Sequence, residues 1–338
     1  MNVRTKLMKL MVVALMVVLV IGVVACGADN ALIGSENGGI QGDLLESPES
    51  NGQDDALASR PVITEDRDGN PITLPDAIDT IISMGPANTE IIVALGFGDK
   101  IIAMDGFSDN IPGVNPDIPK FDMIAPDGEQ IISLMPDVIF VPGMSMQGGT
   151  EDPFWLVSQA GITVIYIPSS TDINGIIEDI RFVGAVLGAD ERAEVIVSEM
   201  QSEIDRIRVI GASVTDARTV YFEVSPAPHM VSFGSGTFLN EMIEIIGAVN
   251  VLAADVYSWA SISDEVILSL DPDVILTSTN FIDDPIGEIA SRPGWGGISA
   301  VRDGSVYFID TDASNRPSHN IVRALLEMAY AIYPETSW

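Results

Sequence analysis

The sequence predicts an α/β protein built from two similar lobes with parallel-rich sheets. We expect a single long helix to join the lobes and a ligand cleft to lie between them. From Arg60 onward, short apolar segments alternate with helical segments, which is typical of parallel sheets covered by helices. A twelve-residue motif occurs twice, from Glu129 and again from Glu265, with eight identical positions. The length of 338 residues also suits two packing units of about 150 residues each.

The N-terminal 26 residues have the pattern of a secretion signal. Basic residues are followed by an apolar run of 17 residues, 10–26, which is short for a membrane span and typical of a signal-peptide core. The run ends Val-Val-Ala-Cys-Gly, which resembles the lipobox of bacterial lipoproteins. We expect residues 1–26 to be a lipoprotein signal peptide and Cys26 to be lipidated. The alternative is a plain signal anchor with a buried cysteine.

Residues 27–60 are predicted to form an acidic flexible tether. They contain seven acidic residues, and no basic residue occurs before Arg60. A flexible chain of this length has a root-mean-square reach of roughly 30–35 Å. A lipid anchor followed by such a tether would hold the rest of the chain outside the cytoplasmic membrane.

The N-terminal lobe is expected over residues 61–189. The turn sequence Asp68-Gly69-Asn70 lies between two β-rich runs, which predicts a hairpin. A helix is expected over 88–95, because Gly96 supplies a stop signal. Short buried strands are expected at 81–84, 101–104, 138–141 and 164–167.

The linking helix is expected over residues 190–208. Gly188 is expected to end the preceding helix, and Asp190 is a suitable N-cap. Apolar residues recur at helical spacing along this segment: Ala193, Ile196, Val197, Met200, Ile204 and Ile207. An ordinary surface helix of a single domain is the alternative interpretation.

The C-terminal lobe is expected over residues 209–338. Its strands are predicted at 220–224, 274–277 and 306–309, and its helices at 238–246 and 320–332. Each copy of the repeated motif, 129–140 and 265–276, predicts a short helix, a Pro-Asp turn and a buried strand. An acid in the first helical turn is favoured by the helix dipole, so both glutamates have a structural explanation. They also place one carboxylate at an equivalent point of each lobe.

Composition excludes several functions. Sixteen basic residues against 49 acidic ones give a net charge of −33, which repels phosphate backbones and argues against nucleic-acid binding. One cysteine excludes an intramolecular disulfide, and two histidines nearly exclude a multi-histidine metal site. We therefore expect no metal and no cofactor. Neither histidine lies in a recognisable catalytic motif, so an enzyme, such as a secreted hydrolase, is not favoured.

Several motifs together resemble the iron/vitamin B12 class of ABC-importer substrate-binding proteins. They are the lipobox, the repeated Glu-x-Ile-x-Ser-Leu-x-Pro-Asp-Val-Ile motif, Pro-Ala-Asn-Thr-Glu at 86–90, and Arg-Pro-Gly-Trp at 292–295 followed by 301–307. The resemblance covers about residues 61–338. It implies two α/β lobes joined by one long helix, a rigid cleft and no enzymatic activity.

The resemblance is strongest to the vitamin B12-binding members of that class, and it implies a set of ligand-contacting positions. Phe107 replaces a family tyrosine, Met123 and Pro142 replace family tryptophans, and Trp259 matches a tryptophan that flanks the corrin. The complete set is Pro86, Ala87, Asn88, Phe107, Met123, Pro142, Trp259, Asp312, Ala313, Ser314, Asn315 and Arg316.

Each candidate also has a simpler explanation. Trp259 is equally compatible with a core aromatic residue. Asp312 and Arg316 are compatible with a surface ion pair, although they follow a predicted strand, where α/β proteins bind ligands. His229, in a proline-rich loop, is a possible ligand contact or axial donor, but a lone loop histidine is more often solvated.

The resemblance implies that the chain captures cobalamin or a related corrinoid and delivers it to a membrane permease and its ATPase. Glu129 and Glu265 fall on the family glutamates that dock onto permease arginines. The partners expected are therefore that permease, the corrinoid and the membrane, with the chain a monomer. The alternative cargo is a ferric hydroxamate siderophore or heme. A tethered sensor or adhesion domain with the same fold is a further alternative.

Overall fold

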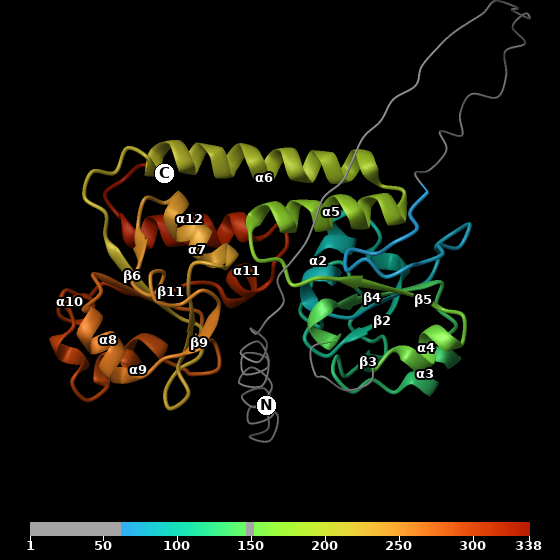
Figure 1. Cartoon of the computed structure of the whole chain (residues 1–338), viewed down its shortest axis with the longest axis horizontal. Helices are drawn as coiled ribbons and strands as arrows, with labels where there is room; N and C mark the ends of the chain where they lie inside the picture. Colours follow the sequence, from blue (N-terminus) through green and yellow to red (C-terminus); the bar gives the residue numbers. More distant parts are fainter. Residues whose placement is uncertain (1–61, 147–151) are drawn as a thin grey trace, which may run out of the picture.

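The computed structural model describes residues 62–146 and 152–338. Two α/β lobes lie side by side, and the long helix α6 (Asp190–Gly211) runs along both of them (Figure 1). The predicted fold class is therefore confirmed. The predicted signal peptide, the tether and Cys26 lie outside the described residues. In the part of the chain that is described, no helix has both the length and the apolar character required to span a membrane.

The N-terminal lobe contains a five-stranded parallel sheet in the order β3-β2-β1-β4-β5. Its strands are continuous apolar runs because helices or loops bury the sheet on both faces. The strands are β1 (Ile81–Ser83), β2 (Ile101–Asp105), β3 (Lys120–Phe121), β4 (Val138–Pro142) and β5 (Thr163–Ile167). The α-helices are α2 (Pro86–Ala94), α3 (Gly128–Ser133), α4 (Trp155–Gln159) and α5 (Ile173–Leu187).

The C-terminal lobe contains a four-stranded parallel sheet in the order β11-β10-β6-β8 and an antiparallel pair, β7 with β9. The strands are β6 (Thr219–Glu223), β7 (Val231–Phe233), β8 (Val249–Asn250), β9 (Trp259–Ser261), β10 (Val274–Thr277) and β11 (Val306–Phe308). The α-helices are α7 (Phe238–Ile245), α8 (Asp264–Leu270), α9 (Pro285–Ser291), α10 (Ser299–Arg302), α11 (Thr311–Asn315) and α12 (Ile321–Ile332).

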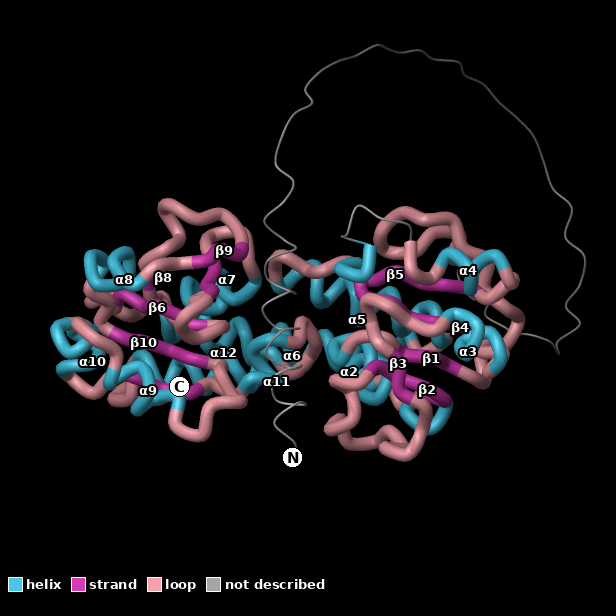
Figure 2. Tube along the Cα trace, turned by 90° about the horizontal axis from the view of Figure 1, so that it is seen from below, coloured by secondary structure: helices cyan, strands magenta, loops and turns pink. Residues whose placement is uncertain are grey.

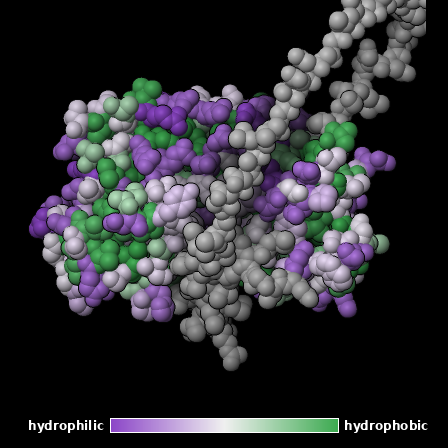
Figure 3. All heavy atoms as spheres, viewed as in Figure 1, coloured by the Kyte–Doolittle hydropathy of each residue, from purple (hydrophilic) through white to green (hydrophobic). Residues whose placement is uncertain are grey.

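Helix α6 belongs to both lobes. All six apolar residues that predicted it are buried. They join one hydrophobic cluster that continues from the N-terminal lobe through α5 and α6 to α7 and α12. Hydrophilic residues cover the outer surface over α6 (Figure 3). A continuous core shared by both lobes opposes large changes in their relative position, because opening it would expose apolar surface.

Three local predictions need correction. The N-cap of helix α6 is Ala189 and not the predicted Asp190, which is the first helical residue and interacts with the helix dipole. The helix ends at Gly211, three residues beyond the predicted end at 208. The predicted hairpin is reduced to a single bridge between Glu65 and Pro71, because the Asp66 carboxylate accepts the turn's backbone N–H groups. The prediction that Gly188 ends the preceding helix is confirmed, with a left-handed φ of 71°.

The repeated motif forms the same structure in both lobes. In the first copy, the Asp137 carboxylate accepts hydrogen bonds from the Thr80 N–H (2.8 Å) and hydroxyl (2.9 Å). In the second, the Asp273 carboxylate accepts them from the Thr219 N–H (2.8 Å) and hydroxyl (2.7 Å). Each aspartate therefore ties the turn after its helix, α3 or α8, to the start of the neighbouring central strand, β1 or β6. The sequence repeat is a structural repeat.

Candidate functional site

The carboxyl ends of β1, β2 and β4 bring several predicted ligand residues together. The turn into α2 requires a glycine, because Gly85 has a φ of 95° and an added Cβ would lie 3.1 Å from the Pro142 ring. The buried Asp105 carboxylate accepts hydrogen bonds from the N–H of Gly85 (2.8 Å) and of Phe107 (2.7 Å). Pro86, Phe107 and Pro142 therefore surround one end of this sheet, the edge at which α/β proteins bind ligands.

In the C-terminal lobe, the predicted residues lie on α11, directly after β11. Asp310 caps this helix by accepting a hydrogen bond from the Ala313 N–H (2.8 Å). Ala313 and Ser314 are buried against the lobe, while Asn315 is exposed and pairs with the Ser278 hydroxyl. Asp312, in the first turn of α11, and Arg316, directly after the helix, both contact residues of the other lobe.

Arg316 connects the two lobes. Its guanidinium donates to Glu90 Oε1 (2.9 Å), to Asn110 Oδ1 (3.0 Å) and to the Phe107 carbonyl oxygen (3.3 Å), all in the N-terminal lobe. It also pairs with Asp312 Oδ1 at 2.8 Å, and Asn110 donates to Asp312 Oδ2 at 2.6 Å. We call Glu90, Asn110, Asp312 and Arg316 the interlobe cluster. Helices α2 and α11, which carry two of its acids, lie next to each other at the lobe boundary in both views (Figures 1 and 2).

Glu90 is the most buried member of the interlobe cluster. Its side chain is 7% exposed, and besides Arg316 it accepts hydrogen bonds from the Ser318 hydroxyl (2.5 Å) and the Asn320 amide (2.9 Å). A second contact between the lobes joins the N–H of Ile173, at the start of α5, to the Glu241 carboxylate of α7 (2.8 Å). Sequence reasoning did not select Asn110, Ser318 or Asn320, because short polar residues in loops carry no distinctive pattern.

The two histidines differ in environment. Burial lowers the pKa of His319, beside Glu90, although the Glu90 charge acts in the opposite direction. The buried His319 Nδ1 has no hydrogen-bond partner, so the ring is neutral near pH 7. His229 is exposed on the loop after β6. Its role as a ligand contact stays a prediction.

The remaining predicted ligand residues are distributed differently. Met123 is 4% exposed and packs in a hydrophobic cluster of the N-terminal lobe that Phe107 also contacts. Asn88 is buried and donates to the Met84 carbonyl oxygen (3.0 Å). Trp259 is half-buried and packs edge-on against Phe233, with ring centroids 5.8 Å apart. Trp259 therefore packs in the core and also has an accessible part, which is compatible both with a core aromatic residue and with a ligand contact.

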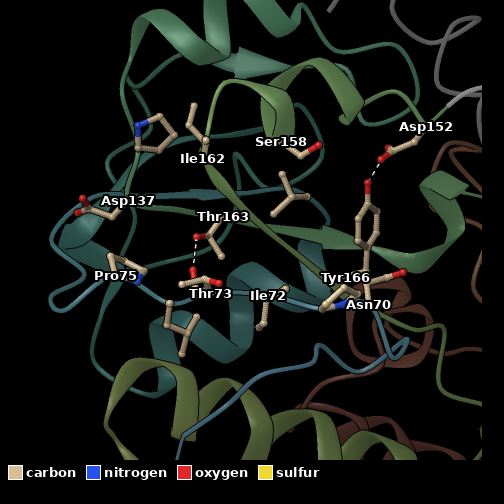
Figure 4. Close-up of a pocket in the computed structure, with 15 residues that line it drawn as sticks. Asn70, Ile72, Thr73, Pro75, Asp137, Asp152, Ser158, Ile162, Thr163 and Tyr166 are labelled. Carbon is tan, nitrogen blue, oxygen red and sulfur yellow. Dashed lines mark hydrogen bonds between the residues drawn. The ribbon is translucent and has the colours of Figure 1, made fainter.

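A pocket of about 680 Å³ lies elsewhere in the N-terminal lobe. It is formed by residues 70–75, β5 and the start of α4, and it contains none of the predicted ligand residues. Figure 4 shows the Tyr166 hydroxyl donating to Asp152 (2.5 Å) and the Thr163 hydroxyl donating to the Thr73 carbonyl (2.7 Å) within it. The Thr163 bond fastens the N-terminal segment to β5, at the edge of the sheet, and the Tyr166 bond fastens the loop before α4 to the same strand. We regard this hollow as a packing feature of that segment, since it lies far from the residues that join the lobes.

The two repeated glutamates occupy equivalent exposed positions. Glu129 lies in the first turn of α3 and Glu265 in the first turn of α8, both on the side of the molecule away from α6 (Figure 1). Hydrogen bonds from its own N–H and from the Ser263 hydroxyl lower the pKa of Glu265. Exposed apolar residues lie next to them: Trp155 on α4, which packs on α3, and Val266 on α8.

The chemistry available at the lobe boundary is that of binding. Over residues 62–146 and 152–338, no group of three or more His, Cys, Asp or Glu side chains is arranged to hold a metal ion. The interlobe cluster contains two carboxylates, one guanidinium and one amide, all engaged with each other. Such groups fix the orientation of a ligand through hydrogen bonds.

Comparisons with known proteins agree with this geometry. The chain is 31% identical, over 82% of its length and 87% of the relative's, to an uncharacterized ABC transporter substrate-binding lipoprotein of Bacillus subtilis. It is 26% identical, over 86% of its length and 79% of the relative's, to a cobalamin-binding protein of Halobacterium salinarum. A solved structure of a possible iron-binding periplasmic protein from Staphylococcus epidermidis superposes with a TM-score of 0.67 at 27% identity, covering 76% of this chain and all of that one.

The family described as periplasmic binding protein matches residues 81–313, which include both sheets, the linking helix and most of the predicted ligand residues. Both lobes and the boundary between them therefore fall within the matched region. The chain belongs to the periplasmic binding protein family, as an extracytoplasmic substrate-binding protein of the ABC-importer class that carries iron compounds or vitamin B12, and it is not an enzyme.

Proposed function

We propose that this chain captures cobalamin or a related corrinoid at the boundary between its lobes and delivers it to an ABC permease. The observation that carries the proposal is that the charge of Arg316 is already paired with carboxylates of this chain. Arg316 is the only lysine or arginine among the predicted ligand residues, and it is already paired with Glu90 and Asp312. A broad, nearly neutral macrocycle with amide groups is suited to apolar surfaces and a few paired polar groups.

The residues around the interlobe cluster support this ligand class. Pro86, Phe107 and Pro142 supply apolar surface at one lobe, and the accessible part of Trp259 supplies an aromatic edge at the other. The cobalamin-binding relative extends over most of the chain. A ferric hydroxamate siderophore is the second candidate, because it too carries little charge and one structural relative is described as possibly iron-binding.

We further propose that the mature chain is attached to the membrane through lipid on Cys26 and docks on the permease through Glu129 and Glu265. The two carboxylates are exposed at equivalent points of the two lobes. A permease with pseudo-twofold symmetry and one basic side chain on each half would match them.

Titration of the purified full-length chain in detergent with cyanocobalamin, followed by tryptophan fluorescence and calorimetry, tests the cargo. We expect one molecule bound per chain and an affinity reduced about tenfold or more by Trp259→Ala. Trp155→Ala serves as the comparison, because Trp155 is an exposed tryptophan on α4 and is not among the predicted ligand residues. Saturation by a ferric hydroxamate with no response to cyanocobalamin would assign the second candidate instead.

Charge reversal tests the docking. Glu129→Lys and Glu265→Lys together are expected to abolish uptake and capture of the permease, while leaving cyanocobalamin binding intact, because both positions lie far from the interlobe cluster. The matched control is Glu199→Lys on α6, an exposed acid on another face. Undiminished uptake by the double variant would exclude these glutamates as the docking groups.

A further inference from the structure

The interlobe cluster has an unequal charge. Glu90 and Asp312 together carry two negative charges, and Arg316 carries one positive charge. His319 next to them is neutral near pH 7 because burial lowers its pKa. The interlobe cluster therefore presents no uncompensated positive charge to a ligand, even though an arginine is at its centre.

Other basic side chains near the same strand ends are also paired with acids. Lys120, at the start of β3, lies 3.8 Å from Asp109 on the loop after β2. Arg323, on α12, lies 2.8 Å from Asp310, the cap of α11. An anionic ligand arriving at this boundary therefore finds carboxylates already bound to the cations that it would need.

The position of Glu90 makes the displacement of Arg316 costly. Glu90 is 7% exposed, and a ligand acid that took Arg316 from it would leave a buried carboxylate with only neutral donors, those of Ser318 and Asn320. Loss of one partner from a buried ion pair is strongly unfavourable. Asp312 is one-third exposed and contributes repulsion at the surface of the same group.

We propose that Glu90, assisted by Asp312, is a specificity-determining residue that excludes anionic ligands, such as carboxylate-bearing macrocycles and catecholate siderophores, by neutralising Arg316. This inference rests on the proposed function, because it assumes that ligands bind at the lobe boundary. It assigns Glu90 a role in selection, not in contact with the ligand.

The test compares hemin, which carries two propionates, with the nearly neutral cyanocobalamin. Both are titrated against the full-length chain and its variants at one fixed detergent concentration. Glu90→Gln keeps the size of the side chain and one of its two accepting oxygens while removing the charge. We expect it to raise the ratio of hemin affinity to cyanocobalamin affinity about tenfold at low salt, and we expect the gain to shrink as salt is added. Asp312→Asn, at a site that is one-third exposed, is expected to raise the ratio about threefold.

The control is Glu241→Gln, which removes the charge from the other contact between the lobes without touching Arg316. If Glu241→Gln raises the ratio as much as Glu90→Gln does, the effect comes from loosened lobes and the proposal is wrong. It is also wrong if neither Glu90→Gln nor Asp312→Asn increases hemin binding. Failure of the wild-type chain to bind cyanocobalamin would overturn the proposed cargo alone, since hemin binding by the variants still reports on the exclusion of anions.

Discussion

The two lobes share a repeated motif, but the buried acids at the ends of β2 and β6 are held differently. In the N-terminal lobe, Asp105 at the end of β2 is fully buried and accepts hydrogen bonds from neutral donors: two backbone N–H groups and the Ser108 hydroxyl (2.5 Å). In the C-terminal lobe, Glu223 at the end of β6 is also buried, but it forms a bidentate pair with Arg292 at 2.6 and 2.9 Å. One carboxylate thus depends on backbone geometry and the other on a single cation.

Arg292 connects further elements of its lobe. It also pairs with Glu288 of α9, and its guanidinium lies 4.5 Å from the centre of the Trp295 ring. The Trp295 indole N–H in turn donates to Asp264 (2.8 Å), the neighbour of Glu265 on α8. The C-terminal lobe therefore links its ligand-facing strand end to its proposed docking helix through polar side chains. The N-terminal lobe uses Asp105 to shape the turn below its ligand-facing surface.

Among the substitutions that test this difference between the lobes, Arg292→Met is expected to reduce the unfolding free energy most. Removal of the cation leaves Glu223 buried without a charged partner, which costs about 3–5 kcal/mol of unfolding free energy. Urea denaturation followed by circular dichroism measures the loss. Adding Glu223→Gln to Arg292→Met should recover part of it, because the buried charge is then gone.

Arg302→Met is the matched control, since Arg302 is exposed, and it should change the free energy by less than about 0.5 kcal/mol. A loss of similar size for Arg292→Met and Arg302→Met would show that the C-terminal lobe does not depend on the buried cation. The contrast between the lobes would then be one of geometry alone.

Asp105→Asn is expected to lower the unfolding free energy by a smaller amount, about 1–3 kcal/mol. The reason is that an amide cannot accept all three hydrogen bonds. Burial raises the pKa of Asp105 despite the hydrogen bonds that it accepts, so the folded state favours the protonated carboxyl group. The stabilising contribution of this group is therefore complete below its unfolded pKa, near 3.8, and decreases as the pH rises through the folded pKa. The unfolding free energy of Asp105→Asn should therefore be lower than that of the wild type by an amount that decreases from pH 4 to pH 7. A deficit that widens with pH would contradict this origin.

Much of the fold could be predicted because periodicity and stop signals are local. The strand at 274–277 and the six apolar residues of α6 were predicted as they occur. Expectations failed where a side chain satisfied the backbone in place of a regular element. Asp66 holds the turn before Pro71 in this way, so no extended hairpin forms.

The site was predicted less completely, because contacts between distant segments leave no local pattern. The family resemblance selected Asp312 and Arg316, but their pairing across the lobes depends on Asn110 and on Glu90, which lies 226 positions before Arg316. Met123 shows another limit: the family resemblance predicts a ligand contact, the structure buries the side chain among apolar neighbours, and its role as a ligand contact stays a prediction.

The smallest expected effect on stability concerns the repeated motif. Because its two copies form the same structure, equivalent substitutions should destabilise the protein by similar amounts. Asp137→Ala and Asp273→Ala each remove a carboxylate that ties a turn to a threonine, and each should cost about 1 kcal/mol in unfolding free energy. Burial opposes ionisation of Asp137, but hydrogen bonds from Asp79 and Thr80 lower its pKa overall, with Lys100 adding to the effect. Its contribution is therefore present above pH 3.8 and lost as the pH falls through the lowered pKa.

Lys100 distinguishes the two copies of the motif, because it places a cation near Asp137. Asp137→Ala should consequently cost slightly more than Asp273→Ala at low ionic strength, and the difference should disappear in about 1 M salt, where the screening length is near 3 Å. Denaturation curves of both variants with and without salt, together with Lys100→Met, measure it. If the difference persists in salt or survives Lys100→Met, it comes from packing or from the additional hydrogen bond that Asp137 accepts from the Asp79 N–H (2.8 Å). If it vanishes in both, the two copies are energetically the same unit, placed in lobes that differ only in what surrounds it.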